Sequence, residues 1–147
     1  MILYADTSAL VKAVLLEVGT DRVGAWFGEA EQVASSVITY AEACAALGRR
    51  DRLRGPDRAA LKAQLARLDV QWNEFLVVPV DERLAGRAAL EHGLRGMDAV
   101  QLSAAMRLRV SVTQYAPDAE VAFAAFDRRL LEAAEREGFA TLGRPLE

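Results

Sequence analysis

The chain has 147 residues, 52% of them hydrophobic and 27% charged, with a formal net charge of −3 at pH 7. This balance is typical of a globular protein with a core of ordinary size, and it excludes an intrinsically disordered chain. The single cysteine, Cys44, and the single histidine, His92, exclude an intrachain disulfide and a cysteine-based metal cage. Because signal-peptide features and a membrane-length apolar run are both lacking, we expect a cytoplasmic protein without a membrane segment.

Short β-rich runs alternate with helical patterns, which predicts an α/β fold with a mainly parallel sheet. We expect a single domain over residues 1–147. In chain order, strands are expected over residues 1–5, 31–35, 75–80 and 121–126, with a possible edge strand over 139–142. Helices are expected over residues 8–16, 20–28, 36–55, 56–72, 82–92, 95–108 and 127–137. The segment 109–120 has no clear period and is expected to be a surface loop.

Four carboxylates stand where predicted strands end or predicted helices begin: Asp6, Glu42, Asp98 and Asp127. Each has a purely structural reading, because Asp98 and Asp127 stand where helix N-caps are expected and Thr39 with Glu42 matches a capping box. Residues at the carboxyl ends of parallel strands line one crevice, so these acids can converge. Carboxylates crowded in this way repel one another unless a cation joins them. The pattern therefore indicates a divalent metal site.

The available ligands indicate which metal such a site prefers. Carboxylate oxygens suit Mg²⁺ or Mn²⁺, whereas a chain with one histidine and one cysteine offers little to zinc. Ions of this kind activate water and neutralise the charge that develops on a phosphodiester. A site of this type hydrolyses phosphate esters without a protein nucleophile.

Four segments carry a resemblance to a known family: "YADTSALVK", "SSVITYAEACAAL", "LRGMDAVQLSAA" and "AAFDRRLLEAA". In order and spacing they resemble the four acidic motifs of PIN-domain ribonucleases, especially the bacterial VapC toxins. The resemblance implies a three-layer α/β/α PIN-like domain and a Mg²⁺- or Mn²⁺-dependent endoribonuclease, the toxin of a VapBC-type toxin-antitoxin system, which cleaves RNA with metal-activated water. It also implies that Asp6, Glu42, Asp98 and Asp127 are the metal-binding and catalytic residues, with Ser8 in support.

Two positions depart from the family pattern. Gln101 stands where relatives often have a histidine, and Ala125 stands where a hydroxyl residue often precedes the Phe-Asp pair. Neither departure removes a carboxylate. They leave open how the residues around the acids adjust the site and which substrate it takes.

Arginines are dense around residues 49–58, and others flank two of the acids. One reading makes them the rim of an RNA-binding groove, since contacts to phosphates dominate nucleic-acid affinity. The other is a solvated helix surface, diluted by Asp51 and Asp57. The candidate RNA-binding residues are Arg49, Arg50, Arg52, Arg95 and Arg128, with Arg129 beside them.

The resemblance also implies partners: a small VapB-like antitoxin with a helical tail, and a second copy of the chain in a homodimer. Apolar residues of the predicted helical hairpin are more numerous than one face of a small sheet needs, so we expect some of them to form an exposed groove for that tail. Those residues are Ala46, Leu47, Leu53, Leu61, Leu65 and Leu68.

Three alternative functions are open to such a chain. A phosphoacceptor receiver module needs an acidic pair near the end of the first strand, where this chain offers only Asp6. A haloacid-dehalogenase-type phosphatase needs a second Asp at position 8, where this chain has Ser8. The remaining alternative is a catalytically inactive PIN-like scaffold that binds RNA or protein. The presence of all four acids weighs against it.

Overall fold

Five parallel strands form one sheet in the order β3-β2-β1-β4-β5 in the computed structural model, which describes residues 1–144. The strands are β1 (Ile2–Ala5), β2 (Gln32–Ser36), β3 (Leu76–Val78), β4 (Val121–Ala124) and β5 (Ala140–Leu142). Each predicted strand is confirmed, including the edge strand β5. The central strands β1 and β4 are almost entirely buried, which explains their continuous apolar sequences.

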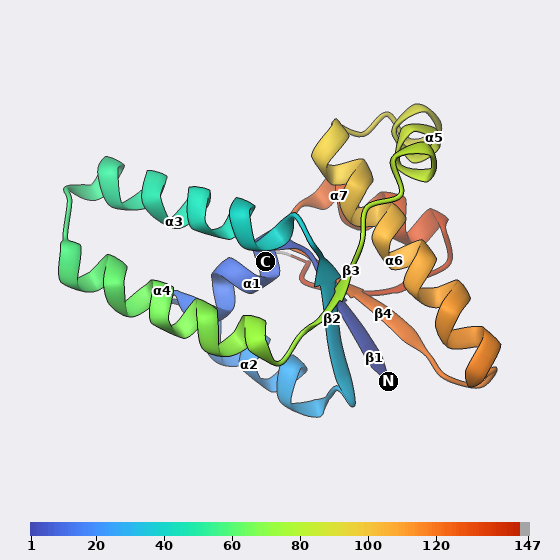
Figure 1. Ribbon diagram of the computed structural model, residues 1–147, viewed down its shortest axis with the longest axis horizontal. Helices are drawn as coiled ribbons and strands as arrows, with labels where there is room; N and C mark the ends of the chain where they lie inside the picture. The colour runs from blue at the N-terminus through green and yellow to red at the C-terminus, as the bar shows by residue number, and fades with distance from the viewer. Residues whose placement is uncertain (145–147) are drawn as a thin grey trace.

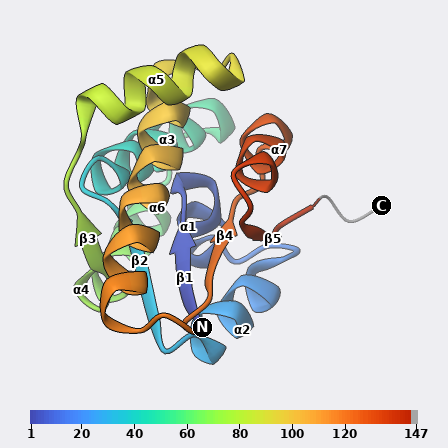
Figure 2. The ribbon, with the colours of Figure 1, turned by 90° about the vertical axis from the view of Figure 1, so that its right-hand side faces the viewer.

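Helices cover both faces of the sheet (Figures 1 and 2). One face carries α1 (Thr7–Val14), α2 (Thr20–Glu29), α3 (Thr39–Arg54) and α4 (Arg58–Asn73), and the other carries α5 (Glu82–His92), α6 (Gly96–Tyr115) and α7 (Arg128–Arg136). The three-layer α/β/α architecture is therefore confirmed. Within residues 1–144, none of the helices is long and apolar enough to cross a membrane.

Strand alternation divides the interior into two cores. Tyr4 and Phe123 stack with ring centroids 5.3 Å apart in the core beneath α5, α6 and α7. Leu3 and Ala5, the neighbours of Tyr4 in the strand, lie in the second core beneath α1 to α4. Each face of β1 thus anchors one helical layer.

The chain changes direction across the sheet between β1 and β4. Strands β2 and β3 follow β1 on one side, after which β4 returns to the other side of β1. Just beyond the paired residues, the Asp6 backbone N–H donates to the Ala124 carbonyl at 3.0 Å. In open parallel sheets, such a switch point opens a crevice at the carboxyl ends of the strands. The ends of β1 and β4 meet there.

Helix α6 is longer than the sequence predicts, because residues 109–115 continue it and do not form a loop. Val112 packs on the core that α6 covers, and the Arg109 guanidinium lies over the Phe139 ring, 3.9 Å from its centroid. Arg109 also donates to the Glu137 carbonyl at 2.8 Å. These contacts offset the low helix propensity of Val110 and Val112.

The helical hairpin of α3 and α4 extends away from the sheet in Figure 1. Leu47 and Leu68 are fully buried, and Leu61 and Leu65 pack partly buried against the same core. Leu53 is 80% exposed near the tip of the hairpin. The expected groove of exposed apolar residues is therefore wrong, because most of its leucines pack in the core that joins the hairpin to α1.

Candidate active site

Asp6 follows β1 directly and begins α1, so it is held at the sheet switch point. Its Oδ1 accepts hydrogen bonds from the Ser8 hydroxyl at 2.6 Å and from the Ala9 backbone N–H at 3.2 Å, which makes Asp6 the N-cap of α1. Ser8 Oγ also accepts from the Phe126 backbone N–H at 2.8 Å, and so links the ends of β1 and β4. Ser8 thus contacts both Asp6 and the chain that follows β4.

Burial dominates the electrostatics of Asp6, whose residue is 5% exposed. Burial raises the pKa of the Asp6 carboxyl to about 7, and the Asp98 and Glu42 carboxylates add to the rise. Hydrogen bonds from Ser8 and Ala9 act in the opposite direction. A carboxylate in this environment gains from a nearby cation.

Glu42 lies in the first turn of α3, and two side chains donate to its Oε1. The Thr7 hydroxyl donates at 2.7 Å and the Gln101 amide at 2.8 Å. The predicted capping box is not formed, since the Thr39 side chain makes no cap hydrogen bond and bonds instead to Gln101. The polar side chains at the start of α3 therefore bond to residues of the crevice and do not cap the helix.

Asp98 lies in the first turn of α6, which begins at Gly96 and has no side-chain cap. The N-cap reading of Asp98 is therefore wrong. Asp127 does cap α7, because its Oδ1 accepts from the Leu130 N–H at 2.9 Å. Both residues line a small pocket of about 100 Å³ together with Gly93, Leu94, Arg95 and Arg129.

The four acids influence one another across the crevice. Burial raises the pKa of Asp98 above its usual value, and Asp127 and Glu42 raise it further, while Arg95 lowers it. Asp98 in turn raises the pKa of Asp6. In addition to burial, these raised pKa values reflect repulsion between the negative charges of the acids. However, no three of these acids have ligand oxygens all within 4.8 Å of one another in residues 1–144.

A second group of possible metal ligands lies between α5 and α7. Ligand atoms of Glu91, His92 and Glu137 all lie within 4.8 Å of one another. His92 Nε2 is 2.7 Å from Glu137 Oε1, and the buried Nδ1 has no hydrogen-bond partner in the described residues. Any measurement of metal binding must separate this group from the four acids.

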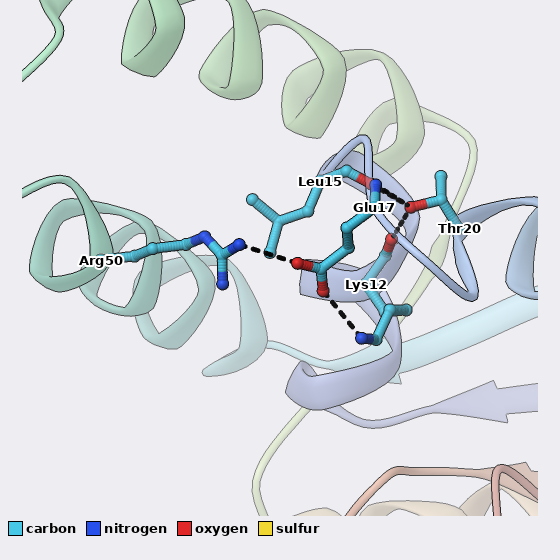
Figure 3. Close-up of polar contacts among 5 residues, drawn as sticks. All are labelled: Lys12, Leu15, Glu17, Thr20 and Arg50. Atoms are coloured by element: carbon cyan, nitrogen blue, oxygen red, sulfur yellow. Dashed lines mark hydrogen bonds and ion pairs between the residues drawn. The ribbon is translucent and has the colours of Figure 1, made fainter. Parts of the chain in front are cut away.

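The candidate RNA-binding arginines do not gather at one place. Arg49 and Arg52 are exposed on α3, about 10–15 Å along the helix from Glu42. Arg50 Nη2 is instead 2.7 Å from Glu17 Oε2, and Lys12 Nζ is 2.7 Å from the other oxygen of Glu17 (Figure 3). Arg50 and Lys12 are thus both paired with one carboxylate.

The arginines beside the acids divide in the same way. Arg95 and Arg129 line the pocket with Asp98 and Asp127. Arg128, in contrast, is 84% exposed at its side chain and pairs with Glu132 at 3.0 Å on the surface of α7. Arg129 is therefore better placed than Arg128 beside the acids.

Sequence reasoning noted Gln101 and Thr39 for other reasons but missed the polar contacts that connect the acids to the core. Thr7 and Gln101 reach Glu42, while Tyr4 and Thr39 reach Gln101. The available signal was spacing, because Gln101 follows Asp98 by three residues and so shares its face of α6. A buried glutamine on that face needs polar partners.

Comparison with known proteins assigns the chain to a family. The model of the PIN domain family matches residues 3–136. The chain therefore belongs to the PIN domain family.

Within that class, the chain resembles proteins named VapC, as its four motifs indicate. Ribonuclease VapC45 of Mycobacterium tuberculosis (strain CDC 1551 / Oshkosh) is 31% identical over 144 residues, which cover 93% of this chain and 92% of that protein. PAE2754 from Pyrobaculum aerophilum has a TM-score of 0.66 at 22% identity, over 96% of this chain and 83% of that one. VapBC2 from Rickettsia felis, bound to a DNA fragment from their promoter, has a TM-score of 0.64 at 12% identity, over 99% and 100% of the two chains. The two solved structures share the fold.

Proposed function

We propose that the protein is a Mg²⁺- or Mn²⁺-dependent endoribonuclease and the toxin component of a VapBC-type toxin-antitoxin system. The observation that carries this proposal is the acidic crevice at the switch point of the sheet, where the buried Asp6 interacts with Glu42 and Asp98. The name of the relative VapC45, a ribonuclease, supports RNA as the substrate. We also propose that the protein is cytoplasmic, because the RNA that it would cleave is found in the cytoplasm.

The donor set fits a hard divalent cation. Asp6, Glu42, Asp98 and Asp127 offer only carboxylate oxygens, which suit Mg²⁺ and Mn²⁺. The hydrogen bonds to Asp6, Glu42 and Asp127 within the described residues all engage one oxygen of each carboxylate, so the second oxygen is available to a ligand. When bound, such an ion polarises the phosphodiester and activates water.

The protein's own residues prepare this crevice before a ligand enters. Ser8 and the start of α1 hold Asp6, while Thr7 and Gln101 hold Glu42. Arg95 and Arg129 supply positive charge beside the acids, and such charge suits the phosphates of an RNA substrate. The crevice thus combines fixed acceptors with a basic edge.

Removal of the metal tests the proposed function. Single-stranded or looped RNA is incubated with the protein in Mg²⁺ or Mn²⁺, then with excess EDTA, and then with Mn²⁺ added back. We expect cleavage that EDTA abolishes and Mn²⁺ restores. Cleavage that survives exhaustive chelation contradicts the metal mechanism, and no cleavage of any RNA under any of these conditions favours the inactive scaffold.

Two neighbouring arginines offer a matched test of RNA binding. The Arg129→Gln substitution is expected to raise the KM for RNA by about threefold to tenfold and to lower the salt dependence of binding, because a phosphate contact is lost. Arg128→Gln is the control, since Arg128 pairs with Glu132. Equal effects of the two substitutions on KM at several salt concentrations would show that neither arginine contacts RNA specifically.

We also propose a VapB-like antitoxin and a second copy of the chain as partners. The similarity to VapC proteins and the fold shared with the Rickettsia felis VapBC2 structure support the antitoxin. An arginine of the antitoxin suits the crevice, because guanidinium and carboxylate groups form strong bidentate contacts. Coexpression with the product of the adjacent gene, followed by measurement of mass in solution, tests both partners.

A further inference from the structure

Gln101 is a buried polar residue at the centre of the molecule. Its residue is 2% exposed, and it lies on α6 one turn after Asp98. Its side chain contacts residues from β1, α1 and α3, which are far from it in the sequence. A buried amide is stable only where both its carbonyl and its NH₂ group are satisfied.

The neighbours of Gln101 determine which way its amide points. The Ser36 backbone N–H can only donate, and it donates to the Tyr4 hydroxyl oxygen at 3.1 Å. The single proton of Tyr4 is then donated to Gln101 Oε1 at 2.6 Å. Because the carbonyl of Gln101 faces Tyr4, its NH₂ group must face the other way.

The NH₂ group of Gln101 meets three oxygen acceptors. Glu42 Oε1 is 2.8 Å from Nε2, Thr39 Oγ1 is 3.0 Å away and Thr7 Oγ1 is 3.1 Å away. Thr7 also donates its own proton to Glu42 Oε1. Glu42 therefore receives two hydrogen bonds on one oxygen, and both donors are themselves held in place.

We propose that Gln101 is a positioning residue that, with Tyr4 and Thr7, fixes the Glu42 carboxylate in the acidic crevice and thereby strengthens the binding of the divalent ion. This inference rests on the proposed function. Partners that orient metal ligands typically change metal affinity by 10- to 100-fold when they are lost. The hydrogen bonds run in one direction, from the Ser36 N–H to Tyr4, from Tyr4 to Gln101 and from Gln101 to Glu42. The residue at position 101 must therefore accept from Tyr4 and donate to Glu42.

Three substitutions separate positioning from packing. Gln101→Met keeps a side chain of similar size but removes both hydrogen bonds. Gln101→His restores an acceptor and a donor, because neutral imidazole has one of each. Gln114→Met is the matched control, since Gln114 is exposed on the same helix. Circular dichroism and thermal melting establish that each variant is folded.

Calorimetric titration with Mn²⁺ measures the effect without RNA cleavage. All proteins carry His92→Gln, which removes a ligand from the Glu91, His92 and Glu137 group. We expect Gln101→Met to weaken Mn²⁺ binding by about 10-fold or more, Gln101→His to stay within about threefold, and Gln114→Met to leave it unchanged. Unchanged affinity in Gln101→Met, or equal losses in the Met and His variants, overturns the proposal.

A second measurement needs no metal. In protein labelled with ¹⁵N-glutamine, the side-chain NH₂ protons of Gln101 should exchange slowly with water, and Tyr4→Phe should accelerate their exchange. Exchange as fast as that of Gln114 overturns the proposal whatever the activity. If the amide is protected but the protein binds no Mn²⁺, the metal mechanism of the proposed function fails, and Gln101 is reduced to a structural cross-link.

Discussion

The Asp98→Asn substitution is expected to lower the rate of RNA cleavage by about 100-fold or more while the protein stays folded. Asp98 is one of the proposed metal ligands, and an amide offers a divalent ion a weaker, neutral oxygen. The fold does not depend on its charge, because Asp98 does not cap α6. Its ionised form is instead repelled by Asp127 and Glu42.

The measurement is single-turnover cleavage of RNA at saturating Mn²⁺, with thermal melting of each protein beforehand. Asp81→Asn is the control, since Asp81 caps α5 through the Leu84 N–H at 3.0 Å and asparagine caps equally well. Asp127→Asn also preserves a cap and should lower activity. Full activity in Asp98→Asn would remove Asp98 from the proposed ligand set.

The Asp6→Asn substitution is expected to stabilise the metal-free protein at pH 8 while it abolishes activity. The pKa of Asp6 is about 7 in the folded protein and 3.8 ordinarily, so the folded state holds a proton that the unfolded chain releases between these values. The contribution of Asp6 to stability therefore falls as the pH rises from about 4 to about 7. Above pH 7, removal of this charge should raise the free energy of unfolding by at most about 4 kcal/mol.

Urea unfolding in EDTA at pH 4, 6 and 8 measures this dependence. Asparagine still offers an oxygen to Ser8 and to the Ala9 N–H, so the cap of α1 is retained. The gain from the substitution should be largest at pH 8 and close to zero at pH 4. Asp57→Asn, an exposed cap of α4, should change stability little at any pH. A gain that is independent of pH would contradict the raised pKa.

Local patterns were sufficient to predict much of the fold. The apolar runs that form the strands are short and separated by helical patterns, and these signals require only neighbouring residues. The end of α5 is also predicted by a local signal, the glycine at position 93. Gly93 has a φ of 62° in the structure, a left-handed conformation that favours glycine. The four acids were found because each stands at the end of a strand or the start of a helix.

Features that depend on tertiary contacts escaped prediction. Val110 and Val112 argue against a helix locally, and α6 continues through them because Arg109 and Val112 are held by partners elsewhere in the chain. The spacing of Leu47 and Leu68 indicates an apolar face, but only the packed structure shows that this face covers the core beside α1. Tyr4 and Gln101 are 97 residues apart, and no local pattern links them.

The position of β4 beside β1 has a consequence for biosynthesis. The hydrogen bond from Phe126 to Ser8 joins residues 118 positions apart, and pairings of such long range form slowly. More than a hundred residues have left the peptidyl-transferase centre before Val121 is added, so a nascent chain has no partner for this edge of its first strand. At about 5–20 residues per second, several seconds or more separate the synthesis of Ser8 from that of Phe126, and the crevice is incomplete during that interval. A crevice built in this way forms only after residues 121–127 have been made, so the earlier part of the nascent chain lacks the arrangement on which the proposed activity depends.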